Sequence, residues 1–145
     1  MKATKEEIRE KFINFSIKIN KLRKYLCNTK HEYNNSDQIQ RSGTSIGANY
    51  CEACFAESNE DFIHKLRIAR KEAYETEYWL KVLTGSELIT NEQYINLSKD
   101  LEELSRILTS SINTVDAKIK DREGAPRGKG QQDAPTSGER LKIDY

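Results

Sequence analysis

Residues 41 to 54 read RSGTSIGANYCEAC, and this stretch decides the fold. It holds Gly43 and Gly47 among small side chains, yet its apolar residues recur at helical spacing. A glycine costs a helix about 1 kcal/mol relative to alanine, so two of them require a compensating gain. Helical winding places Gly43 beside Ile46 and Tyr50 on one face. We therefore predict a helix whose core face carries a glycine so that a neighbouring helix can approach closely.

Apolar residues at helical spacing define four segments of the chain. Three of them open on capping signals, which are Thr4 with Glu7, Ser58 with Asp61, and Thr90 with Gln93. The polar connection NTKHEYNNSD separates the first segment from the second, and Gly85 ends the third. We expect helices over about residues 4–27, 36–54, 58–85 and 90–120.

The C-terminal part of the chain has a different composition. From Asp121 it reads DREGAPRGKGQQDAPTSGERLKIDY, with four of the seven glycines, both prolines and no apolar period. Such a segment is predicted to be disordered. Short connections between helices of similar length favour antiparallel neighbours. The sequence therefore predicts an all-α fold, an up-down-up-down antiparallel four-helix bundle over residues 1–120 with a disordered C-terminal tail over 121–145.

Length and charge exclude several classes of protein. The chain has 145 residues, which is the size of one domain. Its 24 Lys plus Arg balance 23 Asp plus Glu, so any nucleic-acid partner has to meet a local patch. No window approaches the roughly 18 consecutive apolar residues of a membrane span, and the N-terminus lacks the apolar centre of a signal peptide. We expect a cytoplasmic protein without a membrane partner, whose three cysteines are reduced.

A second face of the glycine-containing helix is also small or apolar. A helix of this kind is usually covered on both sides, so we predict that this face meets a second copy of the chain. The third helix adds a matching apolar patch around Trp79, the residue most typical of a subunit contact. The residues expected at the contact are Ala48, Cys51, Phe55, Ile68, Trp79 and Val82. In the alternative interpretation, Trp79 and Phe55 lie over loops or helix ends of their own bundle.

Two blocks, RSGTSIGANYCEA at 41–53 and DFIHKLRIARKEAYETEYWLKVL at 61–83, resemble the bacterial four-helix bundle family that includes proteins encoded within intervening sequences of 23S ribosomal RNA. Outside these blocks, between Ile8 and Val115, the resemblance is a shared apolar rhythm. The family is similar to accessory proteins of diversity-generating retroelements. The resemblance implies a homopentamer, with RNA or a reverse transcriptase as a further partner.

Nucleic-acid binding requires basic residues gathered on one face, ideally with aromatic rings that stack on bases. Two stripes meet this requirement. The first, on the N-terminal helix, comprises Lys11, Lys18, Lys21 and Tyr25, and the second, on the third helix, comprises Arg67, Lys71, Tyr74 and Tyr78. A solvated bundle face would also explain both stripes.

Four residues of the chain together resemble a set of zinc ligands: Cys27, His31, Cys51 and Cys54. Cys51 lies about 22 Å along its helix from the end that adjoins Cys27, at about 1.5 Å per residue. One chain cannot gather the four groups, so we expect packed structural thiols, no metal and no cofactor.

Charged residues also occur within the two blocks of resemblance, among small or apolar neighbours. Arg41, Glu52, Glu72 and Glu75 are expected to form ion pairs that fix the bundle or the register of its subunits. The alternative is acid and base catalysis by Glu72 and Glu75, which would require a pocket. The sequence contains no constellation typical of a nucleophile.

The sequence therefore predicts a non-enzymatic, oligomeric four-helix bundle that acts as an RNA-binding or reverse-transcriptase-associated scaffold. The alternative is a protein-interaction scaffold that does not bind nucleic acid.

Overall fold

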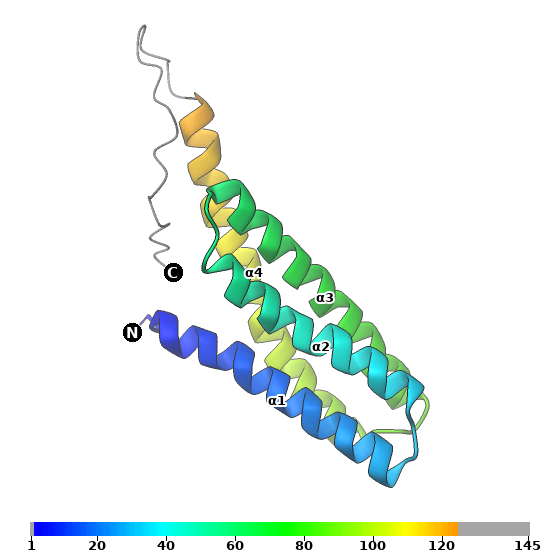
Figure 1. Ribbon diagram of the computed structural model, residues 1–145. Coiled ribbons are helices and arrows are strands. Elements are labelled where there is room, and N and C mark those ends of the chain that lie inside the picture. The colour runs from blue at the N-terminus through cyan, green and yellow to red at the C-terminus, as the bar shows by residue number, and fades with distance from the viewer. Residues whose placement is uncertain (1, 125–145) are drawn as a thin grey trace, which may run out of the picture.

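The computed structural model describes residues 2–124, which form four helices and no strand. The helices are α1 (Lys5–Thr29), α2 (Asn34–Ala53), α3 (Asn59–Gly85) and α4 (Asn91–Gly124). Each runs antiparallel to the one before it, and each packs against its neighbours in chain order, with α4 returning to α1 (Figure 1). The predicted all-α, up-down-up-down bundle is confirmed.

The capping signals start the helices where the sequence placed them. Thr4 and Glu7 form a reciprocal capping box at α1, with distances of 3.1 and 2.7 Å. The Ser58 hydroxyl accepts from the amide of Asp61 at 3.0 Å at the start of α3. A second reciprocal pair, Thr90 with Gln93, precedes α4. These side chains satisfy amide groups that have no partner inside the helix, which is why they mark the starts.

The boundaries of two helices differ from the prediction. Helix α2 begins at Asn34 rather than near Ser36, because the Glu32 carboxylate accepts from the amide of Asn35 at 2.8 Å and so caps the first turn. Helix α4 continues to Gly124, four residues beyond its predicted end. Arginine and glutamate at 122 and 123 favour helix even without an apolar contact. The rest of the predicted tail, 125–145, lies outside the described residues.

The two glycines of α2 face α1. The sequence predicted that Gly43 would let a neighbouring helix approach closely, and that helix is α1. A Cβ atom on Gly43 would lie 2.8 Å from the Ile19 side chain, and one on Gly47 would lie 3.3 Å from the backbone oxygen of Phe12. Beside them, the rings of Phe12 and Tyr50 stack with their centroids 4.0 Å apart. The glycines therefore allow the close packing of α1 on α2, which compensates for their conformational cost.

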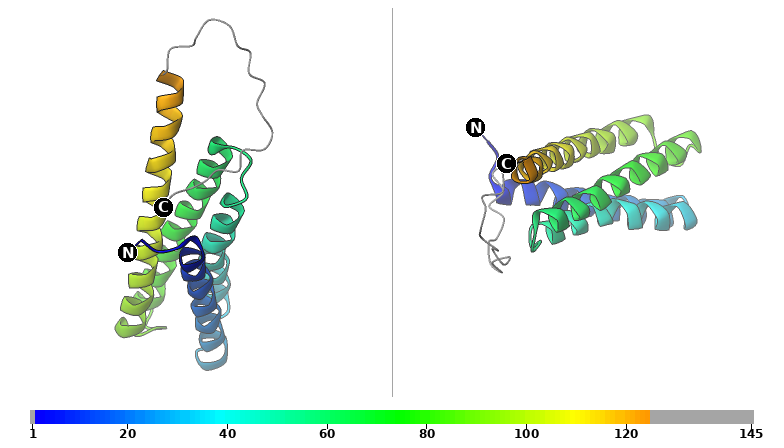
Figure 2. Two further views of the ribbon diagram at one scale, coloured as in Figure 1. Left: turned by 90° about the vertical axis from the view of Figure 1, so that its left-hand side faces the viewer. Right: turned by 90° about the horizontal axis from the view of Figure 1, so that it is seen from above.

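The bundle is more open on one side than on the others. Helices α1 and α4 pack together less extensively than the other three neighbouring pairs, and the final turns of α4 extend past the ends of α2 and α3 (Figures 1 and 2). Among the described helices, none combines the length and the apolar character needed to cross a bilayer. The seam between α1 and α4 is the least closely packed side of the bundle.

Candidate functional site

The first basic stripe, Lys11, Lys18, Lys21 and Tyr25, faces this seam. Lys11 forms an ion pair with Glu103, and Lys18 forms one with Asp100 at 2.5 Å. Tyr25 is half-buried and packs against the core. Because two of its three lysines already meet carboxylates, this stripe attracts a phosphate backbone less than its sequence suggested.

Two adjoining hollows follow the same seam. Their volumes are about 370 and 450 Å³, and both are lined by Lys18 and Lys21. Phe15 and Leu104 supply apolar surface to one hollow, and Leu22 and Leu97 supply it to the other. Since Asp100 and Glu103 stand opposite the lysines, the seam is a groove of mixed charge with apolar surface inside it.

The second basic stripe, Arg67, Lys71, Tyr74 and Tyr78, lies on the exposed side of α3. Tyr74 and Tyr78 are each 59% exposed. Lys71 is exposed, and Arg67 reaches Asp116 of α4 at 3.5 Å, a weak contact at the surface. We call these four residues the α3 stripe. It retains the combination of free cation and open aromatic faces that single-stranded nucleic acids bind.

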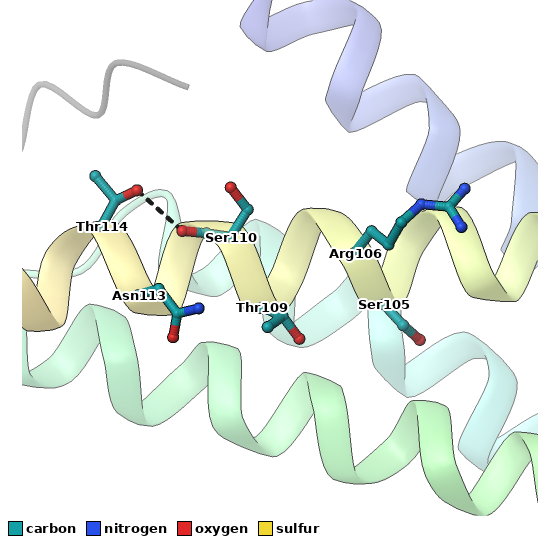
Figure 3. A pocket seen from close by; sticks show the side chains of 6 residues that line it. All are labelled: Ser105, Arg106, Thr109, Ser110, Asn113 and Thr114. Carbon is teal, nitrogen blue, oxygen red and sulfur yellow. Dashed lines mark hydrogen bonds between the residues drawn. The ribbon is translucent and has the colours of Figure 1, made fainter.

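Polar side chains gather on one stretch of α4. They are those of Ser105, Arg106, Thr109, Ser110, Asn113 and Thr114 (Figure 3). Ser105, Thr109 and Asn113 point toward α3, whereas Ser110 and Thr114 point away from it (Figure 3). Sequence reasoning missed this polar surface, although the four-residue spacing of Ser105, Thr109 and Asn113 marks them as one side of a helix.

The predicted subunit contact lies on the outer side of α2 and α3, and we call it the outer face. Ala48 is exposed and Phe55 is 74% exposed, whereas Cys51, Ile68, Trp79 and Val82 are half-buried. Trp79 packs in part against the core of its own bundle, and its Nε1 donates to Glu75 Oε1 at 3.3 Å. Its other neighbour is Tyr78, whose ring meets it edge-on at 4.9 Å. The bundle thus covers part of Trp79 and leaves Phe55 open.

The four charged residues expected to form ion pairs within the two blocks of resemblance do not form one network within a single chain. Glu52 pairs with Lys65 at 2.9 Å, a partner that sequence reasoning missed. Glu72 lies close enough to Glu75 for the second charge to act on its carboxyl, and among residues 2–124 no carboxylate lies within ion-pair distance of the exposed Arg41. A role for these charges between subunits stays a prediction.

The Glu72 carboxyl makes the stability of the folded chain depend on pH. Burial raises the pKa of its carboxyl above the ordinary value of 4.5, Glu75 raises it further, and Lys71 opposes the shift. A raised pKa means that the folded state binds the proton more tightly than the unfolded chain does. The ionised carboxylate therefore lowers stability above its folded pKa, and this cost disappears as the pH falls through that pKa toward 4.5.

We expect Glu72→Gln to raise the melting temperature at pH 7 by up to about 3 °C and to leave it nearly unchanged near pH 4. The glutamine keeps the size of the side chain and removes the charge at every pH. Thermal unfolding followed by circular dichroism across this pH range measures the difference. A lower melting temperature for the variant at pH 7 would contradict the prediction and would indicate that a cation compensates the carboxylate.

The cysteines lie at opposite ends of α2. Cys27 reaches the Ser36 hydroxyl at 3.4 Å near the start of the helix, whereas Cys51 and Cys54 stand at its end. All three are free thiols and half-buried. Burial raises the pKa of the Cys51 thiol, neighbouring Cys54 raises it further, and Arg9 lowers it. Because its pKa is raised, the Cys51 thiol is a poor nucleophile and acts as a packing group.

Comparison with known proteins places this arrangement in a family. Residues 4–110 match the model of the family described as 23S rRNA-intervening sequence protein. The chain belongs to this family. The matched residues include the caps of α1 and α3, both glycines of α2 and the whole α3 stripe.

A solved structure supports the assignment to the intervening-sequence family. It is the crystal structure of a protein with unknown function from the S23 ribosomal protein family of Bacteroides thetaiotaomicron VPI-5482. The two sequences are 50% identical over 72% of this chain and 97% of that chain, with a TM-score of 0.71. No curated relative matches the sequence. The family resemblance expected from the two sequence blocks is therefore confirmed.

Proposed function

We propose that this chain is a non-enzymatic scaffold that self-associates through its outer face and binds RNA along its α3 stripe. The observation that carries the proposal is the exposure of Tyr74 and Tyr78 beside Lys71, on a side of α3 that the bundle leaves uncovered. The structure favours this stripe over the one on α1, where Lys11 and Lys18 already have carboxylate partners. A homopentamer, which the family resemblance implies, would repeat the stripe about fivefold and so raise the avidity of a nearly neutral chain.

The test compares the two stripes. We expect Arg67→Gln with Lys71→Gln to weaken binding of a labelled RNA about tenfold at low salt, because two phosphate contacts are removed. The matched control is Lys18→Gln with Lys21→Gln, which removes the same charge from the seam and should have a smaller effect. Fluorescence anisotropy at several salt concentrations measures both affinities. Equal RNA affinity of the parent and a variant lacking all four cations, or no RNA binding by the parent, would refute the proposal.

The second candidate is a protein-interaction scaffold, with a reverse transcriptase or another protein as the partner. It is favoured by the seam between α1 and α4, where apolar surface lies between carboxylates and lysines. A surface of mixed charge with an apolar centre suits a protein better than a phosphate backbone. No RNA binding by the parent, together with self-association, would favour this candidate.

A further inference from the structure

We propose that the α3 stripe and the adjoining side of α4 form a subsite for single-stranded nucleic acid, in which unpaired bases stack on Tyr74 and Tyr78. The inference rests on the proposed function and specifies its substrate class. It differs from general attraction to RNA because the binding energy comes mainly from base faces.

The spacing of the two tyrosines fits a nucleobase. They are four residues apart on α3, so their side chains leave the helix about 6 Å apart along its axis. Stacked bases are separated by about 3.4 Å, and a base held between two rings needs about twice that distance. Both rings are 59% exposed, so their faces can meet a base without displacing the core. Because about 6 Å falls short of that distance, the pair offers one base a place against each ring.

A duplex cannot use this surface in the same way. Its bases are covered on both faces by their neighbours in the stack, so a tyrosine ring reaches them only after they are unstacked. An unpaired strand has no such cost, and every base has a face that an aromatic ring can contact. The exposed tyrosines therefore select a single strand and tolerate different sequences.

The cations on the same side of α3 are few. Lys71 precedes Tyr74 by one helical turn and is exposed, while Arg67 holds Asp116 only at 3.5 Å. Two phosphate contacts give a single-strand salt dependence with a slope of about −1.4 on a double-logarithmic plot. Tight binding with so small a salt slope would therefore indicate stacking, because two phosphate contacts by themselves bind weakly.

Polar groups on α4 lie beside the tyrosines. The contact between Arg67 and Asp116 shows which parts of the two antiparallel helices lie level with each other. Counting forward along α3 and backward along α4 from this contact, the same number of residues leads to Tyr74 and to Thr109, which are therefore level with each other. The same count brings Tyr78 level with Ser105. Figure 3 shows the side chains of Ser105 and Thr109 directed toward α3. Hydroxyl groups at these places can donate to and accept from base edges or a ribose 2′-hydroxyl.

The experiment measures the affinity of the full chain for a labelled oligouridylate of about 12 nucleotides and for an RNA duplex of the same length. We expect the single strand to bind more tightly, and Tyr74→Leu with Tyr78→Leu to weaken it by about 30-fold, since leucine keeps the apolar volume and removes the ring. Phenylalanine at both positions should restore binding. Tyr33→Leu is the matched control, because Tyr33 is similarly exposed at 58% but lies between α1 and α2.

Trp79 provides a second readout. It is the single tryptophan of the chain, and its ring meets Tyr78 at 4.9 Å. A base stacked on Tyr78 should quench the fluorescence of Trp79, and the RNA concentration at half-maximal quenching should equal that at half-maximal anisotropy change. The leucine variant should lose this quenching.

The outcomes separate the two proposals. Unchanged affinity in the leucine variant, or equal affinity for duplex and single strand, overturns the stacking subsite. If Arg67→Gln with Lys71→Gln still weakens binding in that case, the proposed function stands without it. Absence of binding to either RNA overturns both.

Discussion

Replacing Gly43 by valine is expected to lower the free energy of unfolding by about 3 kcal/mol, because the new side chain overfills a closely packed contact. Already the Cβ atom would lie 2.8 and 2.9 Å from the two γ-carbons of Ile19. These atoms are near the stem of the isoleucine, which cannot swing away as a long flexible side chain could. Helix α1 would have to shift from α2, which would also disturb the stack of Phe12 on Tyr50.

Urea unfolding followed by circular dichroism measures this loss, and a decrease of about 10 °C in the melting temperature should accompany it. Gln38→Val is the control for a β-branched residue in α2, because Gln38 is exposed on the same helix. Valine has a higher helix propensity than glycine, so propensity alone would stabilise the Gly43 variant. A neutral or stabilising effect of Gly43→Val would therefore show that α1 does not pack against this glycine.

Repeating the Gly43→Val substitution in an Ile19→Ala variant tests whether the contact with Ile19 causes the loss of stability. Ile19→Ala removes the atoms that the valine would meet, so Gly43→Val should cost much less in that background than in the parent. The two effects are coupled only if the side chains occupy the same space. Equal costs in both backgrounds would contradict the packing shown by the structure.

The sequence predicted the glycine contact well because helical periodicity alone places a residue on a face. The same reasoning placed the capping boxes, the apolar stripes and the exposed tyrosines of α3, all of which depend on neighbours within one helix. Resemblance to known sequences predicted the family as well, because the two blocks identified the family that residues 4–110 match.

Contacts between helices were less predictable. The pairing of Lys18 with Asp100, which weakens the α1 stripe as a phosphate site, depends on the register and separation of α1 and α4. Periodicity gives the face of each residue and leaves the register open. The same gap explains why Lys65 was missed as the partner of Glu52, and why the polar side of α4 near Thr109 was not connected with Tyr74. Register is decided by side-chain packing over the whole interface.

Trp79→Ala combined with Phe55→Ser is expected to convert the proposed assembly into single chains. Large aromatic residues at the centre of an interface each contribute about 2 kcal/mol or more, so their joint loss should weaken association about a thousandfold. Phe55 is 74% exposed within one chain, so its ring is available for burial by a second copy. Light scattering over a range of protein concentrations measures the mass of the parent and of the variant.

Tyr33→Ser is the matched control, since it removes an aromatic ring of similar exposure from the connection between α1 and α2. Trp79 also packs on its own core, so its loss lowers stability as well. A second variant, Ala48→Arg with Phe55→Ser, changes only exposed positions of the outer face and should dissociate the assembly with the helical circular dichroism unchanged.

The oligomeric state of the parent and of both variants shows which surface forms the interface. A parent that is monomeric at all concentrations would contradict self-association and leave Phe55 as an exposed loop residue. An assembly that survives both variants would instead require another surface. The exposed side of α1 is the alternative, because Ile13 and Ile17 are one turn apart there and each is 45% exposed. Charge reversal at Lys24, on the same side of α1, would then dissociate the assembly, whereas it should have no effect if the outer face is the interface.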